Sequence, residues 1–240
     1  DAKGASCLNG MPAIMLLSGG LDSVTALAWA QREGFAILQA LSFTYGQRHA
    51  REVSAAAAVA EHYGIPHQIV ALTPISGSSL TDLGNIPQGR DLSALQETIA
   101  PTYVPNRNMI LIAYAAAHAL LTDAAHIIGG WNAADALNYP DCREPFLAAA
   151  QETLRQATER GFIIARPLIR DDKPAIIRRA LALDAPIELT WTCYLGEERA
   201  CGSCDACQLR VTAFKQIGVI DPVPYTADID WSGCTPFSRS

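Results

Sequence analysis

The chain has 240 residues, half of them hydrophobic, and a formal net charge of −6 at pH 7. This fits one large domain, or one domain with an appendage, and the charge excludes a whole-chain basic footprint for nucleic acid. No apolar stretch approaches the roughly 20 residues that span a bilayer, and residues 1–10 lack the pattern of a signal peptide. We therefore expect a cytoplasmic protein with a flexible leader at residues 1–11.

Strand and helix signals alternate along the first third of the chain. The apolar run Ala13–Leu17 predicts a buried strand, and residues from about Ser23 to Glu33 predict a helix that Gly34 ends. A second strand, an alanine-rich helix and a third strand are expected at residues 37–43, 50–63 and 67–72. Residues 73–105 are rich in proline and glycine and too long for a simple connection, which predicts a functional loop or lid.

The alternation continues along the second half of the chain. Helices are expected at about 107–121, 144–160 and 173–183, and strands at 125–128 and 162–165. Repeated strand–helix units predict an α/β fold, a Rossmann-like doubly wound parallel sheet with helices on both faces. We assign residues 12–185 to this domain and residues 186–240 to a C-terminal segment packed on it. Ligands bind such sheets beyond the carboxyl ends of the strands.

The first predicted strand runs directly into Ser18-Gly19-Gly20-Leu21-Asp22-Ser23, and a helix follows at once. Such a junction points backbone N–H groups and a helix N-terminus at one spot, which suits an anion, and the glycines let a phosphate approach. No lysine follows the glycines, so this is not the loop that grips β- and γ-phosphates through a lysine. We expect a pyrophosphate site; the alternative is an ordinary turn with Asp22 or Ser23 as helix N-cap.

Four of the seven cysteines cluster near the C-terminus, at Cys193, Cys201, Cys204 and Cys207. In a cytosolic chain, such clustering indicates a metal rather than disulfides. The two short spacings let four thiolates converge, which suits a structural, tetrahedral Zn²⁺ site that folds the C-terminal segment onto the sheet. An iron–sulfur cluster and the absence of any metal are the alternatives.

Five further strings, at strand ends and around the cysteines, narrow the chemistry: Phe43–His49, Val104–Asn108, Tyr139–Arg143, Thr190–Tyr194 and Cys201–Arg210. The Ser18–Ser23 loop resembles the pyrophosphate (PP) loop of the N-type ATP pyrophosphatases. Together, these strings are similar to those of the 7-cyano-7-deazaguanine synthase family of the queuosine pathway. The similarity spans about residues 12–218, in the expected order.

The resemblance implies an adenine-nucleotide alpha-hydrolase type of fold with a PP-loop ATP-binding domain. It implies an ATP-dependent carbon–nitrogen ligase that converts 7-carboxy-7-deazaguanine and ammonia to 7-cyano-7-deazaguanine. The carboxylate and then the amide would be adenylated, releasing AMP and pyrophosphate. Zinc and a homodimer are also implied, with neither nucleic acid nor a membrane as partner. In-line attack on a phosphate further calls for Mg²⁺ and cationic groups nearby.

Several residues are candidates for the ATP site and for catalysis. We expect ATP to contact the loop and the end of the second strand, at Leu17, Ser18, Gly19, Gly20, Leu21, Asp22, Ser23, Gln47 and Arg48. Asp22 is the expected ligand of the metal or of a metal-bound water, and Lys173 the expected cation for the phosphates. Arg107 is assigned to the substrate carboxylate or the phosphates. Lys173 could instead be a solvated helix residue, and Arg107 part of a surface ion pair.

The planar base calls for its own set of side chains. Asp141 is the candidate acceptor for the base N–H groups, Arg143 a candidate for the carboxylate or the phosphates, and Tyr139 and Trp131 candidates for stacking. The alternatives are a turn aspartate, a surface ion pair and packing aromatics. Cys142 could form a covalent intermediate, but a lone cysteine is more often a small packed residue.

Two stretches depart from the family's pattern. Asn106 stands where the family usually has glycine, and residues 135–138 read Asp-Ala-Leu-Asn where it commonly has Asp-aromatic-Ser-Gly. The second stretch precedes the expected base reader, Asp141. The acceptor therefore stays open among three alternatives: 7-carboxy-7-deazaguanine converted to the nitrile, the same base converted only to the amide, and another carboxylate, including one on a protein. A tRNA-modifying relative and a non-catalytic nucleotide-binding module are the remaining alternatives.

Overall fold

The structure is a computed structural model that describes residues 10–46, 51–82, 86, 88–89, 99–195 and 198–238. Five parallel strands form one sheet in the order β3-β2-β1-β4-β5. Their bounds are β1 Pro12–Leu16, β2 Ala36–Thr44, β3 His67–Ala71, β4 His126–Ile128 and β5 Ile163–Ala165. The predicted parallel α/β sheet is confirmed.

Five of the helices correspond to predicted ones: α1 Leu21–Arg32, α2 Arg51–His62, α3 Arg107–Thr122, α5 Glu144–Thr158 and α6 Lys173–Ala182. The predicted start of α1 was wrong by two residues, and neither Asp22 nor Ser23 is its N-cap. Gly20 precedes the first helical residue, and the Ser23 hydroxyl donates back to the Gly20 carbonyl at 3.0 Å. The early start places Asp22 and Ser23 in the first turn of the helix.

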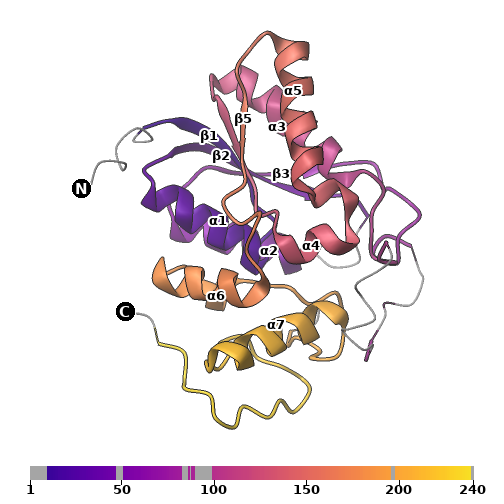
Figure 1. The fold of residues 1–240 in the computed structure, drawn as a ribbon, viewed down its shortest axis with the longest axis vertical. Coiled ribbons are helices and arrows are strands. Elements are labelled where there is room, and N and C mark those ends of the chain that lie inside the picture. The colour runs from indigo at the N-terminus through magenta and orange to yellow at the C-terminus, as the bar shows by residue number, and fades with distance from the viewer. Residues whose placement is uncertain are drawn as a thin grey trace.

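Each face of the sheet packs against its own set of helices (Figure 1). Along β1, Ala13 and Met15 pack with α1, α2 and α6, whereas Ile14 and Leu16 pack with α3 and α5. All four side chains are at most 9% exposed. Alternation along a strand directs successive side chains to opposite faces, so an uninterrupted apolar run produces a core on both sides.

The C-terminal part of the chain packs on the same scaffold. Helix α7, Asp205–Ile217, packs on α6, and Figure 1 shows α6 and α7 as successive layers beyond α1. The fully buried Phe214 of α7 belongs to the core that α1 and α6 form. A separate small core surrounds the four cysteines and includes Trp191, Val223 and Tyr225. Within the described ranges, no helix is both long enough and apolar enough to cross a membrane.

The strand order reverses between β1 and β4, which creates the crevice where ligands bind in open α/β sheets. Gly130, just after β4, lies directly against the first turn of α1. A Cβ atom at Gly130 would stand 2.6 Å from the Asp22 carbonyl carbon and 2.7 Å from the Ser23 nitrogen. Glycine is therefore required at this position to bring the end of β4 beside the loop after β1.

Helix α4, Ala133–Asn138, was not predicted. Its six residues are too few to show a helical period in the sequence. Asn132 supplies the local signal, because its side chain accepts a hydrogen bond from the Asp135 N–H at 3.0 Å as the N-cap. This short helix brings Asp135 to the crevice.

Asn106 has a left-handed backbone conformation, with φ 53° and ψ 26°, directly before α3. Glycine and asparagine are the residues that adopt this region most readily. The departure from the family's usual glycine is thus conformationally conservative, and it preserves the turn that starts α3 with Arg107.

We expect Asn106→Val to lower the free energy of unfolding by about 1–2 kcal/mol, because a β-branched residue is strained at positive φ. Asn106→Gly should change it by less than about 1 kcal/mol. Urea denaturation of the three proteins measures both effects. If the glycine variant is the less stable of the two, the backbone conformation does not explain the choice of asparagine.

Candidate functional site

A cavity of about 290 Å³ lies at the carboxyl ends of β1, β2 and β4. Its walls come from the loop after β1, the first turns of α2 and α3, helix α4, the start of α6, and the segment Trp191–Tyr194. Open α/β sheets bind their ligands at this place. The cavity therefore collects side chains from the whole length of the domain.

The loop after β1 is held in shape by its own serines. Ser18 Oγ accepts a hydrogen bond from the Gly20 N–H at 3.2 Å, and Ser23 Oγ accepts one from the Ser18 N–H at 3.2 Å. Gly19 has φ 83° and no room for a side chain, because a Cβ atom would overlap the Glu52 carbonyl oxygen. The loop is thus a pre-organised turn that closes against α2.

The first turn of α1 presents backbone N–H groups without a helical acceptor to the cavity. The first helical hydrogen bond runs from the Val24 N–H to the Gly20 carbonyl at 3.1 Å. The N–H groups of Leu21, Asp22 and Ser23 therefore have no helical acceptor, and all three residues line the cavity. This is the arrangement that binds phosphate at a helix N-terminus. Leu17, Ser18 and Gly20 also line the cavity, whereas Gly19 does not.

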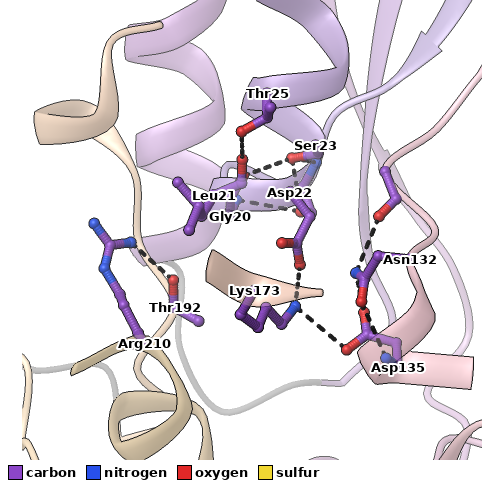
Figure 2. A network of polar contacts seen from close by, with 12 residues as sticks. Gly20, Leu21, Asp22, Ser23, Thr25, Asn132, Asp135, Lys173, Thr192 and Arg210 are labelled. Atoms are coloured by element: carbon purple, nitrogen blue, oxygen red, sulfur yellow. Dashed lines mark hydrogen bonds and ion pairs between the residues drawn. The ribbon is translucent and has the colours of Figure 1, made fainter. Parts of the chain in front are cut away.

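Lys173 and Asp22, 151 residues apart in sequence, form an ion pair in the cavity (Figure 2). The Lys173 Nζ donates to Asp22 Oδ2 at 2.7 Å and to Asp135 Oδ1 at 3.4 Å. Burial lowers the pKa of Lys173, but the Asp135 and Asp22 carboxylates raise it by more, above its ordinary value. Only 16% of the side chain is exposed, so Lys173 is a cavity ammonium and not a solvated helix residue.

Three more predicted residues line the same cavity: Arg107, Tyr139 and Trp131. Arg107 Nη1 donates to the Tyr45 hydroxyl at 2.9 Å, and the Tyr139 hydroxyl lies 2.6 Å from the Thr102 hydroxyl. The Trp131 indole N–H is bonded within the structure as well, to Asn108 Oδ1 at 3.0 Å. Aromatic walls beside the Arg107 guanidinium suit a flat ligand that carries a carboxylate.

Asp141 and Arg143 do not line the cavity. The buried Asp141 accepts a hydrogen bond from the Asn108 N–H at 2.9 Å, in the first turn of α3. It satisfies a free helix donor there and places its charge at the positive end of the helix. Arg143 donates to the Ala136 carbonyl at 3.0 Å. Gln47 and Arg48, which were expected to contact ATP, lie outside the described residues.

The altered stretch Asp135–Asn138 keeps its one cavity residue. Asp135 lines the cavity, but Ala136, Leu137 and Asn138 do not, and 53% of Leu137 is exposed. The substituted positions therefore lie outside the lining of the cavity. The substitutions at residues 136–138 therefore do not change which side chains line the cavity, and Asp135 remains the residue that α4 contributes.

Cys142 is buried against the cavity, with 4% of its surface exposed, and it accepts a hydrogen bond from the Asn108 side chain at 3.3 Å. Burial, and then the charges of Asp135 and Asp141, raise the pKa of the Cys142 thiol well above its ordinary value. The nucleophilic form of cysteine is the thiolate. These surroundings therefore oppose a covalent role for Cys142.

We expect iodoacetamide at pH 8 to alkylate Cys142 at least about tenfold more slowly than the partly exposed Cys234. Peptide mass spectrometry of the folded protein at successive times measures both rates. Cys234 serves as the internal control, because it lies outside the cysteine cluster. Equal rates at the two sites would show that Cys142 is available as a thiolate.

The four clustered cysteines converge on one point. Their sulfur atoms all lie within 4.8 Å of one another, and the Cys201 and Cys207 sulfurs are 3.8 Å apart. Backbone N–H groups donate to the sulfurs: those of Leu195 and Cys201 to Cys193 Sγ, and those of Ser203 and Cys204 to Cys201 Sγ. Such donors stabilise thiolates, so the cluster is a possible metal site.

One short segment connects this cluster to the loop after β1. The Trp191 N–H donates to the Gly19 carbonyl at 2.9 Å, two residues before Cys193. Arg210 of α7 fixes the same segment, since its Nη1 donates to the hydroxyls of Thr190 and Thr192 at 2.8 and 3.0 Å. Asp221 holds the rest of the buried guanidinium, at 2.6 and 2.9 Å. The cysteine cluster and the loop therefore share one hydrogen-bonded wall.

Several residues that line the cavity had no role predicted from the sequence, among them Glu52, Asp135, Tyr194 and Arg210. The last three belong to stretches that resemble the family's, which was the signal that could have identified them. Glu52 carried no sequence signal, and only the approach of α2 to the loop brings it into the wall. Burial raises the pKa of Glu52 to about 7 although the nearby Arg107 lowers it.

Comparison with known proteins assigns the chain to a sequence family. Residues 12–218 match the family model described as "Queuosine biosynthesis protein QueC". The 7-cyano-7-deazaguanine synthase of Thermosynechococcus vestitus is 46% identical over 222 residues, which cover 89% of this chain and 95% of that protein. The synthase of Thermoplasma volcanium is 43% identical, covering 89% and 90%. Among solved structures, the NMN synthetase from Francisella tularensis matches 76% of this chain and 64% of its own, with 18% identity and a TM-score of 0.42.

Proposed function

The chain belongs to the family of the queuosine biosynthesis protein QueC, and we propose that it is an ATP-dependent ligase that converts 7-carboxy-7-deazaguanine and ammonia to 7-cyano-7-deazaguanine. One observation carries this proposal. The same cavity is lined by a phosphate-type loop, a buried ammonium, aromatic side chains and the Arg107 guanidinium. That is the layout needed to bring ATP and a flat carboxylic acid together.

The loop end of the cavity binds the triphosphate. The free N–H groups at the start of α1 receive the pyrophosphate portion, and the Lys173 ammonium neutralises charge that develops as the α-phosphate is attacked. Asp22 would hold Mg²⁺, which when bound would offset the charge of the phosphate oxygens. A carboxylate fits this ion because Mg²⁺ prefers oxygen ligands, and Asp22 Oδ1 is buried without a hydrogen bond to any described residue.

The aromatic end of the cavity binds the acid. Arg107 holds the substrate carboxylate with one oxygen directed at the α-phosphorus, so that attack forms the acyl adenylate and releases pyrophosphate. Ammonia then displaces AMP and leaves an amide. Adenylation of the amide oxygen by a second ATP releases pyrophosphate and one N–H proton, and loss of AMP with the remaining N–H proton yields the nitrile. Both adenylations use the same loop.

We propose Zn²⁺ as the metal of the cysteine cluster. Zn–S bonds of about 2.3 Å in a tetrahedron put neighbouring sulfurs about 3.8 Å apart, which matches the compact set of four sulfurs. An iron–sulfur cluster would need several iron atoms between these sulfurs, and hence a wider cage. Four thiolates leave no open position, so the role of the zinc is structural.

The reaction test incubates the zinc-loaded protein with ATP, Mg²⁺, ammonia and 7-carboxy-7-deazaguanine. We expect AMP that depends on the acid, and a nitrile product by mass spectrometry. Folded protein with full metal content that forms neither product would overturn the proposal, and AMP with an amide as sole product would assign the amide-forming alternative. Light scattering of the same preparation tests the homodimer that we propose from the family resemblance.

A further inference from the structure

Asp135 is the second carboxylate on the Lys173 ammonium, and the reaction as proposed above gives it no task. We propose that Asp135 is a positioning residue, which keeps the Lys173 ammonium directed at the phosphates of ATP while Asp22 is engaged by Mg²⁺. This inference rests on the proposed function, because it assumes that the loop end of the cavity binds Mg²⁺ and ATP.

The surroundings of Asp135 fix its side chain. Asn132, which is fully buried, donates from Nδ2 to Asp135 Oδ2 at 2.8 Å and to the Gly130 carbonyl at 3.3 Å. The Asp135 N–H donates back to Asn132 Oδ1 at 3.0 Å. One carboxylate oxygen is thus held by Asn132, and the other, Oδ1, is left for Lys173 at 3.4 Å.

Asp22 and Asp135 approach the ammonium from different elements. Figure 2 shows Asp22 reaching the Lys173 nitrogen from the first turn of α1, and Asp135 reaching it from α4 on another side. An ammonium has three donor positions, so two carboxylates leave one for a phosphate oxygen. The Lys173 side chain can therefore keep its place while it binds a third partner.

Asp22 alone could not hold Lys173 during the reaction. Once its oxygens bind a divalent cation, they attract the ammonium less, and the cation repels the ammonium directly. Asp135 then remains as the anchor on the far side of Lys173. The charges agree with these separate roles of Asp22 and Asp135. Two carboxylates around one ammonium leave a net charge of −1, which favours the entry of a further cation.

The direct test compares Asp135→Asn with Asp171→Asn. Asparagine keeps the shape of residue 135 and removes its charge, whereas Asp171 lies near the start of α6 but pairs with Arg179 at 2.9 Å. Calorimetry measures the affinity of each folded variant for ATP with Mg²⁺. We expect a loss of about tenfold or more for Asp135→Asn and less than about twofold for Asp171→Asn. A loss below about twofold for Asp135→Asn overturns the proposal.

A double-mutant cycle separates positioning from a general structural role. In a Lys173→Met background, Asp135→Asn should have little further effect on the affinity for ATP, because the residue acts through the ammonium. An equal loss of ATP affinity in both backgrounds assigns Asp135 a structural role only.

A second variant and the composition of the binding assay keep the ATP-affinity measurement interpretable. If Asp135→Asn does not fold, Asp135→Glu is measured instead; it retains the charge but displaces it, and an unchanged affinity for ATP overturns the proposal. Because the binding assay contains no deazaguanine, it succeeds or fails independently of the acceptor. Wild-type protein that forms no AMP with the acid, but shows the Asp135 effect on ATP binding, would refute the proposed reaction and support the positioning role.

Discussion

Lys173→Met is expected to lower the rate of AMP formation by about a hundredfold to a thousandfold, the typical cost of removing one stabilising group from a developing charge. Methionine preserves most of the side-chain volume but leaves Asp22 and Asp135 without their shared ammonium. Two uncompensated carboxylates would then face the phosphates of ATP. The loss should appear both in kcat and in the affinity for ATP, because the ammonium contacts the phosphates of bound ATP and also offsets the charge that grows in the transition state.

Arg178→Met is the matched control, because it removes a cation from the exposed face of the same helix, α6. It should leave the rate within about twofold. Circular dichroism and metal analysis should find both variants folded with full metal content. A Lys173→Met enzyme within about tenfold of wild type has lost less than about 1.4 kcal/mol of transition-state stabilisation, which would refute the role of the ammonium in adenylation.

Loss of the metal is expected to weaken ATP binding as well as the fold. Cys204 is fully buried among the four sulfurs, so Cys204→Ser should abolish tight metal binding. Because metal binding contributes directly to folding free energy, we expect a fall in Tm of about 10 °C or more. The Trp191 N–H bond to the Gly19 carbonyl would lose its support, and the affinity for ATP should fall by about tenfold or more.

Cys234→Ser provides the control for a cysteine outside the cluster, and it should keep the metal, the Tm and the affinity for ATP. Calorimetry with ATP and Mg²⁺ at a temperature where both variants are folded separates binding from global stability. Linkage makes the effect reciprocal, so bound ATP should raise the affinity for the metal, measured as a higher chelator concentration at half removal at equilibrium. Metal-free, folded Cys204→Ser protein that binds ATP as tightly as wild type would show that the two sites are independent.

The features that the sequence alone determined are local in the chain. The apolar run Ala13–Leu17, the Ser18–Ser23 loop and the four clustered cysteines each lie within a short segment, where period, turn chemistry and ligand spacing can be read directly. They were sufficient for the parallel sheet, the likeness to the family and the possible metal site. Every predicted strand was found because a buried strand needs only a few consecutive apolar residues.

Only the tertiary structure decided which side chains meet. Lys173 lies beside Asp22 because β1 and β5 are parallel strands of one sheet. The segments that follow these two strands therefore leave the sheet at the same edge. Asp141, a candidate for binding the base, instead caps the start of α3. Asp135 contacts the Lys173 ammonium, which no sequence motif indicated. A carboxylate next to a turn has the same local sequence whether it binds a helix end or a ligand. Its partner depends on the packing of distant elements, which the sequence does not specify one residue at a time.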